Sequence, residues 1–112
     1  MGKFVVKNRK NGDFQFDLKA TNGQVILSSQ GYKSKRTCLQ GIESVKRNSQ
    51  VDARFERKEA KDGSPYFNLK ATNGQIIGTS EMYSSVAAME NGIASVAKNA
   101  PEAVVEDTTL EA

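Results

Sequence analysis

The chain of 112 residues contains no histidine, no tryptophan and a single cysteine. Without histidine it lacks the commonest general acid or base near neutral pH and the commonest metal ligand. A single cysteine excludes an intrachain disulfide, and cysteine–histidine catalysis has no histidine to use. We therefore expect a protein that is not an enzyme and has no metal site and no cofactor. A hydrolase that combines serine or threonine with lysine remains an open alternative.

Long apolar runs are also missing. Apolar runs such as residues 25–27 fall far short of the roughly 20 residues that cross a bilayer. The first residues contain no apolar segment typical of a secretory signal. A lone cysteine is compatible with a reducing compartment. We therefore expect a cytoplasmic protein with no membrane partner.

The chain repeats itself. The string Leu-Lys-Ala-Thr-Asn-Gly-Gln at residues 18–24 recurs letter for letter at residues 69–75, and a shift of 51 positions aligns residues 3–49 with 54–100 at 21 identities in 47 pairs. Two copies are too few for a solenoid, and one copy would bury too little surface for comfortable stability. We predict two repeats that share one core, as a monomer with an internal pseudo-dimer. The first repeat spans residues 1–50, the second spans 51–105, and an acidic tail spans 106–112.

Each repeat is predicted to contain three strands. The strand-like segments of the first repeat span residues 3–10, 14–19 and 24–28, and each recurs 51 positions later. Apolar and polar residues alternate along the second segment, as in a half-buried strand. In its second copy Pro65 replaces Phe14, which suits the first residue of a strand. Asn-Gly or Asp-Gly dipeptides, favoured in type I′ hairpins, stand in the turns; those with the Asn-Gly-Gln motif are Asn22, Gly23, Asn73 and Gly74.

A helix is predicted after each third strand. Ser34 and Ser85 are candidate N-caps, and Asn48 and Asn99 are candidate left-handed residues at the helix ends. The apolar stripe that packs each helix contains Cys38, Gly41, Ile42 and Val45, and Met89, Gly92, Ile93 and Val96. A glycine inside a helix costs about 1 kcal/mol relative to alanine, so its presence in both copies indicates close approach to a strand or to the other helix. Cys38 on this stripe is interpreted as a buried structural thiol.

These features resemble the YegP-like family of uncharacterised bacterial proteins. The resemblance rests on the Asn-Gly-Gln turn, the Tyr-x-Ser entry to the helix and the Gly-Ile-x-Ser-Val string, each present twice, and it covers nearly the whole chain except the acidic tail. It implies an α+β fold of two tandem β-β-β-α(-β) repeats. They form one pseudo-twofold domain, a single antiparallel sheet wrapped around two helices, with terminal strands exchanged between repeats. The family has no established activity and no assigned site residues, so the resemblance implies nothing catalytic.

Charge is distributed unevenly along the chain. Residues 1–50 contain ten basic and three acidic residues, residues 51–100 contain six of each, and residues 101–112 contain four acidic residues and no basic one. Lysines beside aromatic side chains on an exposed sheet are typical of single-stranded nucleic-acid binding. The candidate residues for an anionic partner such as nucleic acid are Lys7, Arg9, Lys10, Lys19, Lys33, Lys35, Arg36 and Tyr66.

Other interpretations of the same residues stay open. The lysines of the strands also fit a solvated sheet face that discourages edge pairing, and an exposed strand edge would fit a protein-interaction or scaffold module. Tyr32 and Tyr83 are expected to anchor the helices to the sheet. The tail 106–112 is expected to be a disordered end, with shielding of the basic repeat as the alternative.

Overall fold

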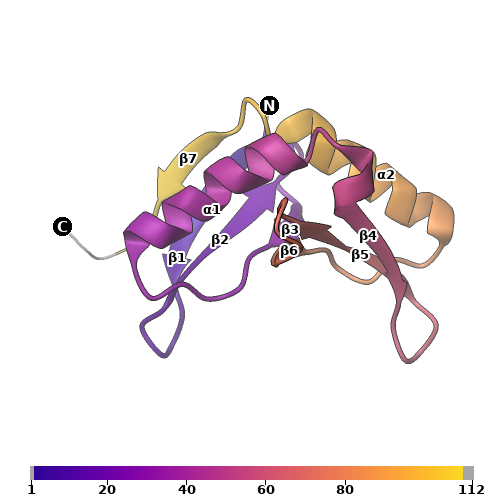
Figure 1. The fold of residues 1–112 in the computed structure, drawn as a ribbon, viewed down its shortest axis with the longest axis horizontal. Coiled ribbons are helices and arrows are strands. Elements are labelled where there is room, and N and C mark those ends of the chain that lie inside the picture. Colours follow the sequence, from indigo (N-terminus) through magenta and orange to yellow (C-terminus); the bar gives the residue numbers. More distant parts are fainter. Residues whose placement is uncertain (1, 110–112) are drawn as a thin grey trace.

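The computed structural model describes residues 2–109, and both repeats are built in the same way (Figure 1). The elements of the first repeat are β1 (Lys3–Asn8), β2 (Phe14–Lys19), β3 (Val25–Ser28) and α1 (Lys35–Asn48). Those of the second are the 3-10 turn η1 (Asp52–Arg54), β4 (Phe55–Glu59), β5 (Pro65–Lys70), β6 (Ile76–Thr79), α2 (Val86–Asn99) and β7 (Val104–Asp107). The predicted α+β class and the order of strands and helix in each repeat are confirmed. Pro65 is the first residue of its strand, as expected.

All seven strands form one sheet in the order β4-β5-β6-β3-β2-β1-β7. Five of its six strand pairs are antiparallel, but β7 runs parallel to β1. The expectation of a wholly antiparallel sheet is therefore corrected to a mixed sheet. The reason is that β7 follows a helix that crosses back over the sheet, so the chain re-enters the sheet in the direction of β1.

The strand exchange implied by the family resemblance occurs at one end only. β7 belongs to the second repeat and pairs with β1 of the first, with Lys3 opposite Val104 and Val6 opposite Asp107. In the first repeat the residues 51 positions earlier form η1 and the start of β4 instead. The sheet therefore ends in β4 on one side, with no further strand beside it among residues 2–109.

The acidic segment also differs from the expected disordered tail. Glu106 and Asp107 are the last two residues of β7, and Thr108 donates from its backbone N–H to the carbonyl of Val6 at 2.9 Å. These residues are ordered by the ladder with β1. Residues 110–112 lie outside the described part of the chain.

The hairpin turns do not have the predicted type I′ geometry, because each contains only one residue with positive φ, a glycine. In the first turn the N–H of Gly12 donates to the carbonyl of Arg9 at 3.0 Å, and φ is positive at Gly12 but not at Asn11. The Asn11 side chain instead accepts from the N–H of Asp13 at 3.0 Å. The other three turns repeat this arrangement. The dipeptides therefore predict the position of each turn correctly, although not its type I′ geometry. The turn is closed by an asparagine or aspartate side chain that bonds to the backbone two residues on and by a glycine with positive φ.

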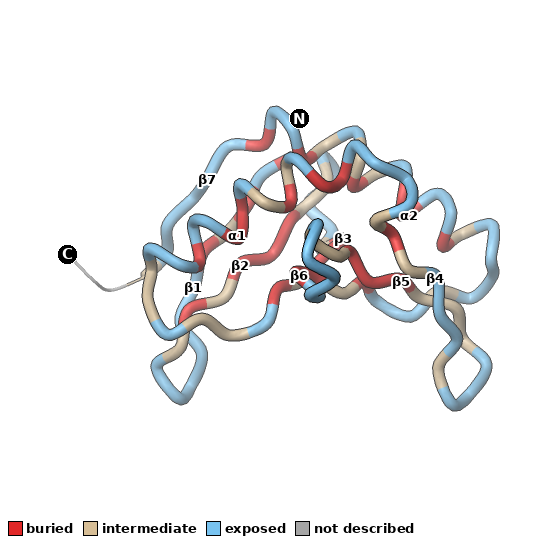
Figure 2. The backbone as a smooth tube through the Cα atoms, in the orientation of Figure 1, coloured by how far each residue is buried: buried red, intermediate tan, exposed pale blue. Residues whose placement is uncertain are grey.

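Each helix begins at the predicted cap and packs on the sheet through the predicted stripe. The Ser34 and Ser85 hydroxyls accept from the N–H groups of Thr37 and Ala88 at 3.1 and 3.0 Å. Asn48 and Asn99 are not left-handed, because within residues 2–109 only glycines have positive φ. Each amide instead donates back along its helix, Asn48 to Ser44 and Asn99 to Ser95. Figure 2 shows the buried backbone positions on the helices and on the strands beneath them.

The two helical glycines make room for tyrosine rings. A Cβ added at Gly41 would lie 2.4 Å from the Tyr32 hydroxyl oxygen, and one at Gly92 would lie 2.2 Å from that of Tyr83. The Tyr32 ring stacks on Phe16 with centroids 6.2 Å apart, and the second repeat has the same stack. The tyrosines are thus helix-to-sheet anchors, as predicted, and the close approach is between helix backbone and an aromatic side chain.

No helix within residues 2–109 is long and apolar enough to cross a membrane.

Candidate functional site

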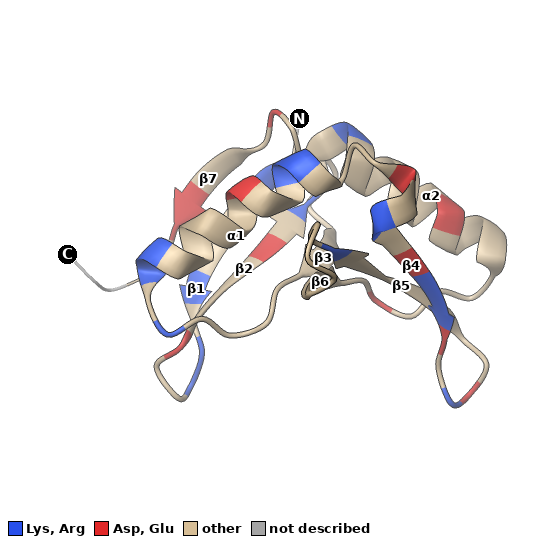
Figure 3. Ribbon diagram, viewed as in Figure 1, with Lys and Arg blue, Asp and Glu red and all other residues tan. Residues whose placement is uncertain are grey.

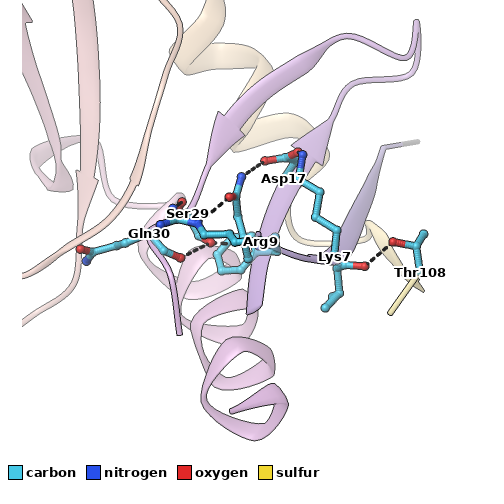
Figure 4. A network of polar contacts seen from close by, with 9 residues as sticks. Lys7, Arg9, Asp17, Ser29, Gln30 and Thr108 are labelled. Carbon is cyan, nitrogen blue, oxygen red and sulfur yellow. Dashed lines mark hydrogen bonds and ion pairs between the residues drawn. The ribbon is translucent and has the colours of Figure 1, made fainter. Parts of the chain in front are cut away.

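Two of the predicted basic residues belong to an internal network on the face of β1 and β2 that turns away from the helices (Figure 4). The Lys7 ammonium lies 2.8 Å from Asp17 Oδ2, and the Gln15 amide donates to Asp17 Oδ1 at 2.9 Å. Arg9 donates through Nε to Gln15 at 2.9 Å and through Nη2 to the carbonyl of Ser29 at 3.4 Å. Asp17, only 5% exposed, is the centre of this network. Asp17 neutralises Lys7, whereas the Arg9 side chain bonds only to uncharged acceptors among residues 2–109.

The network also controls the ionisation of Asp17. Burial raises the pKa of this carboxyl. Hydrogen bonds from Lys7, Gln15 and Ser28, together with the charge of Lys7, outweigh that effect, so the pKa lies below its ordinary value of 3.8. Asp17 is therefore ionised at neutral pH despite its burial. In the second repeat the same position is Asn68, which accepts from Thr79 and donates to Glu56. Sequence analysis gave Asp17 no role, because its partners come from three different strands.

Strand β7 neutralises two more lysines of the first repeat. Lys3 Nζ lies 2.8 Å from Glu106 Oε1, and Lys35 Nζ lies 2.7 Å from Asp107 Oδ2. The hydrogen bond from Lys35, followed by those from Thr109, lowers the pKa of Asp107 to about 2. The net charge of +7 over residues 1–50 is thus reduced by acids that lie 103 and 72 residues after their lysine partners in the chain.

Four cations of the predicted set, including Arg9 from the network above, lie at one end of the first repeat. We call Arg9, Lys10, Lys33 and Arg36 the hairpin-end cluster. They come from the β1–β2 hairpin and the start of α1, two segments that are joined by backbone bonds between Phe14 and Tyr32. Figure 3 shows basic residues at this end of the molecule.

Asp13 is an acidic residue of the β1–β2 hairpin at this end. It lies 3.5 Å from Lys33, whose side chain is 92% exposed. Gly31 packs closely against the side chains of Asp13 and Arg9, because a Cβ added there would be 2.9 Å from Asp13 Oδ2 and 3.0 Å from Arg9 Nη1. Its counterpart Met82 is 53% exposed, so the two helix entries differ.

Two members of the predicted set stand apart. Lys19 is at the other end of β2, near Glu106. Tyr66 is on β5, which is separated from β2 by β6 and β3, and its partner across the ladder is Lys58. The structure therefore does not bring Tyr66 together with the basic residues of the first repeat. Sequence position alone could not show this, because the order of strands across the sheet joins the repeats through β3 and β6.

The residues with potential chemical reactivity are structural or dispersed. Cys38 is fully buried, and burial followed by the charge of Asp107 raises the pKa of its thiol to about 11. Within the described residues, no three His, Cys, Asp or Glu side chains are grouped so that they could hold a metal ion. Burial of Cys38 on the helix stripe is as predicted.

A cleft between the repeats was missed by the sequence analysis. It is lined by the end of α1, by η1 and by the β5–β6 turn, and it contains Arg47 and Arg54. The available signal was the pair of Ser-x-x-x-Asn strings at Ser44–Asn48 and Ser95–Asn99, whose spacing of four places both side chains on one helix face. The position of Arg54 beside this pair could not be inferred, because it depends on how the second repeat docks.

Comparison with known proteins finds the same architecture in bacterial proteins. The family model of the Domain of unknown function (DUF1508) matches twice, at residues 10–56 and 60–107. A UPF0339 protein encoded in the ptx operon 5' region of Stutzerimonas stutzeri is 53% identical over 104 residues, covering 93% of this chain and 94% of that protein. The UPF0339 protein YegP of Yersinia pestis is 49% identical over 110 residues and 98% of each chain.

Solved structures of two similar proteins agree with the fold. The solution NMR structure of a UPF0339 protein from Shewanella oneidensis has a TM-score of 0.92 and 51% identity, covering 98% of this chain and 93% of that chain. That of yegP from E. coli, described as a protein of unknown function, has a TM-score of 0.93 and 45% identity, covering 99% and 96%.

Proposed function

This chain belongs to the bacterial family of the domain of unknown function DUF1508, which confirms the YegP-like resemblance, and we propose that it is a non-enzymatic binding module for an anionic partner. The partner class is nucleic acid, and the contact surface is the hairpin-end cluster. The observation that carries the proposal is the difference between the repeats. Residues 51 positions after Arg9, Lys33 and Arg36 are Ala60, Ser84 and Ala87.

The arrangement of these cations supports binding to phosphate. The side chains of Lys10 and Arg36 make no hydrogen bond or ion pair with any of residues 2–109, and the Arg9 side chain bonds there only to neutral oxygens. Within residues 2–109, Asp13 is the only carboxylate that forms an ion pair with any of these four cations. Cations close to a backbone of phosphates release its bound counterions, which gives affinity that depends on salt and not on sequence. Because Tyr66 is on another part of the sheet, this surface supplies charge without a stacking platform, and we expect weak discrimination among sequences.

The test is a fluorescence-anisotropy titration of labelled single-stranded DNA and RNA at about 50 and about 200 mM salt. The variant Lys10→Gln/Lys33→Gln/Arg36→Gln should bind more weakly, and its salt dependence should be shallower by about 2 in log–log slope, since each lost phosphate contact on a single strand contributes about 0.7. The matched control Lys58→Gln/Lys61→Gln/Lys98→Gln removes the same charge from the second repeat and should bind as the wild type does. Equal loss in both variants, or no binding at the lower salt, would contradict the proposal.

A second candidate function is capture of an extended protein segment at the edge of β4. The specific observation in its favour is that the equivalent strand β1 holds β7, whereas β4 has no neighbour on its outer side within the described residues. The side chain of Arg57 covers part of this edge. Arg57 donates to the carbonyl of Phe55 at 3.4 Å and to the carboxylates of Glu90 and Asp52 at 2.7 and 3.0 Å. A protein ligand would bind independently of the three cations substituted above, so the same titration and its variants separate the two candidates.

A further inference from the structure

The cleft that contains Arg54 lies between the repeats, away from the hairpin-end cluster. It has a volume of about 400 Å³ and is open to solvent. α1 contributes Ser44, Arg47 and Asn48, and the turn between β5 and β6 contributes Thr72 and Asn73. Arg54 is the last residue of η1 and enters between these two walls.

Arg54 is held in place by neutral oxygen atoms from both repeats. Its Nη1 donates to Asn48 Oδ1 at 2.8 Å and to Thr72 Oγ1 at 2.8 Å. Asn48 is only 6% exposed, and its own amide donates to the carbonyl and hydroxyl oxygens of Ser44 at 2.8 and 3.1 Å. The guanidinium is therefore oriented by a chain of hydrogen bonds. Its other N–H groups are not engaged by any carboxylate of residues 2–109.

The cleft has two positive charges and no negative one. No Asp or Glu is among its lining residues, and the side chain of Arg47 makes no hydrogen bond or ion pair with the described residues. By contrast, the neighbouring Lys46 lies 3.7 Å from Glu43, and Arg57 is bound by two carboxylates. The last carbonyls of α1 do not require these guanidinium groups, because the carbonyls of Val45, Arg47 and Asn48 accept from backbone N–H groups of residues 49–51.

The equivalent cleft of the other repeat lacks this arrangement. It is lined by Thr21, Ser95, Lys98, Asn99 and Glu102, so the serine and asparagine of the helix are present in both. The position 51 residues after Arg54 is Val105, part of β7, and the position 51 residues after Val51 is Glu102. One cleft therefore contains two arginines without an acid, and its twin contains one lysine and one glutamate.

We propose that the Arg47–Arg54 cleft binds the phosphate group of a small phosphorylated molecule. A phosphate monoester carries close to two negative charges at neutral pH, which matches the two guanidinium groups, whereas a single carboxylate carries one. Guanidinium is planar and donates two parallel hydrogen bonds to phosphate oxygens, and the fixed position of Arg54 lowers the entropy that binding costs. The hydroxyls of Ser44 and Thr72 line the cleft beside it. This site is separate from the surface proposed for nucleic acid.

The test is a titration of the full-length, isotope-labelled protein with inorganic phosphate, followed by the backbone and arginine side-chain NMR signals at constant ionic strength. We expect saturable shifts confined to the signals of Arg47, Asn48, Arg54, Thr72 and their neighbours. Acetate at the same ionic strength should cause no saturable shift there. If acetate binds equally well, or if phosphate shifts only the hairpin-end cluster, the assignment of a phosphate site to this cleft is overturned.

Variants separate binding from a purely structural role of Arg54. Arg47→Gln should weaken phosphate binding about tenfold or more by removing one charged donor. Its thermal midpoint should not change, because the Arg47 side chain is exposed and makes no hydrogen bond or ion pair within residues 2–109. Arg54→Lys keeps the charge, loses the paired donors and should also bind more weakly. The matched control is Lys98→Gln, the counterpart of Arg47 in the twin cleft, which should bind phosphate as the wild type does. Unchanged affinity in Arg47→Gln, or equal loss in Lys98→Gln, would overturn the proposal.

Discussion

At the scale of single residues, one buried carboxylate distinguishes the first repeat from the second. Asp17 and Asn68 occupy equivalent positions, and both are nearly fully buried on the outer face of the sheet. Asp17 is bonded to Lys7 and Gln15, so the lysine cannot be counted as a free cation. The charge of a surface is therefore decided by which lysines have partners.

The substitution Asp17→Asn tests this role, because asparagine already fits the equivalent site. The pKa of Asp17 is lowered in the folded state, so its ionised form stabilises the protein above its ordinary pKa of 3.8, and this contribution is lost as the pH falls below that value. We expect the substitution to lower the free energy of unfolding by about 1–3 kcal/mol near neutral pH, the range for a buried hydrogen bond to a charged group. Urea denaturation near neutral pH and near pH 3 measures it. A loss of the same size at both pH values would contradict the expected ionisation.

At the scale of elements, β7 decides how much positive charge the first repeat exposes. It adds to the edge of β1 and brings Glu106 to Lys3 and Asp107 to Lys35. All four residues of β7 are exposed, so the strand is held by its ladder with β1 and by these ion pairs. This geometry favours the interpretation of the acidic segment as a shield for the basic repeat.

The variant Glu106→Gln/Asp107→Asn removes the shielding charges and keeps the strand. We expect it to bind single-stranded nucleic acid more tightly, by about tenfold at low salt, because Lys3 and Lys35 become available to phosphate. The matched control Glu59→Gln/Glu81→Gln removes two exposed acids of the second repeat. Anisotropy titrations of both variants measure the effect; unchanged affinity in the first, or the same gain in the control, would rule out shielding by β7.

At the scale of the whole molecule, the two repeats depend on each other for their core. β3 and β6 join the halves through one residue pair, Ser28 and Thr79, while α1 contacts β6 and α2 contacts β3. At this junction the repeats are complementary and not identical. Leu27 is fully buried, and its counterpart 51 positions later is Gly78, which lies against it. Two leucines there would compete for one space across the pseudo-twofold axis.

The substitution Gly78→Ala should therefore destabilise the protein. A Cβ at this position would lie 2.7 Å from Leu27 Cγ and 2.8 Å from Cδ2, closer than atoms can pack. We expect a loss of about 1–3 kcal/mol in the free energy of unfolding, as for other overpacked sites. The second alanine should cost much less in the Leu27→Ala background, a coupling that a double-mutant cycle from urea denaturation measures. Additive losses would show that the two residues do not compete.

Much of the fold could be predicted from local patterns that occur twice. The Asn-Gly turns, the serine caps and the helical stripe depend on contacts within a few residues, so the same string forms the same structure in both repeats. The pairing of tyrosine with helical glycine was not predicted, because the helical glycines indicated close approach to a strand or to the other helix. This pairing forms only when the helix packs on a strand of its own repeat, and the residues of the helix alone do not indicate that packing.

The amino-acid sequence by itself determined the repeat, the three strands and helix of each copy, and the excess of basic residues in the first. Only the tertiary structure decided the direction of β7, the neutralisation of Lys7 and Lys35, the separation of Tyr66 from the basic cluster, and the meeting of Arg54 with Asn48 and Thr72. The physical reason is the range of the interactions. Turns, caps and periodicity act between near neighbours in the chain, whereas ion pairs and clefts act between side chains that only the docking of one repeat on the other brings together.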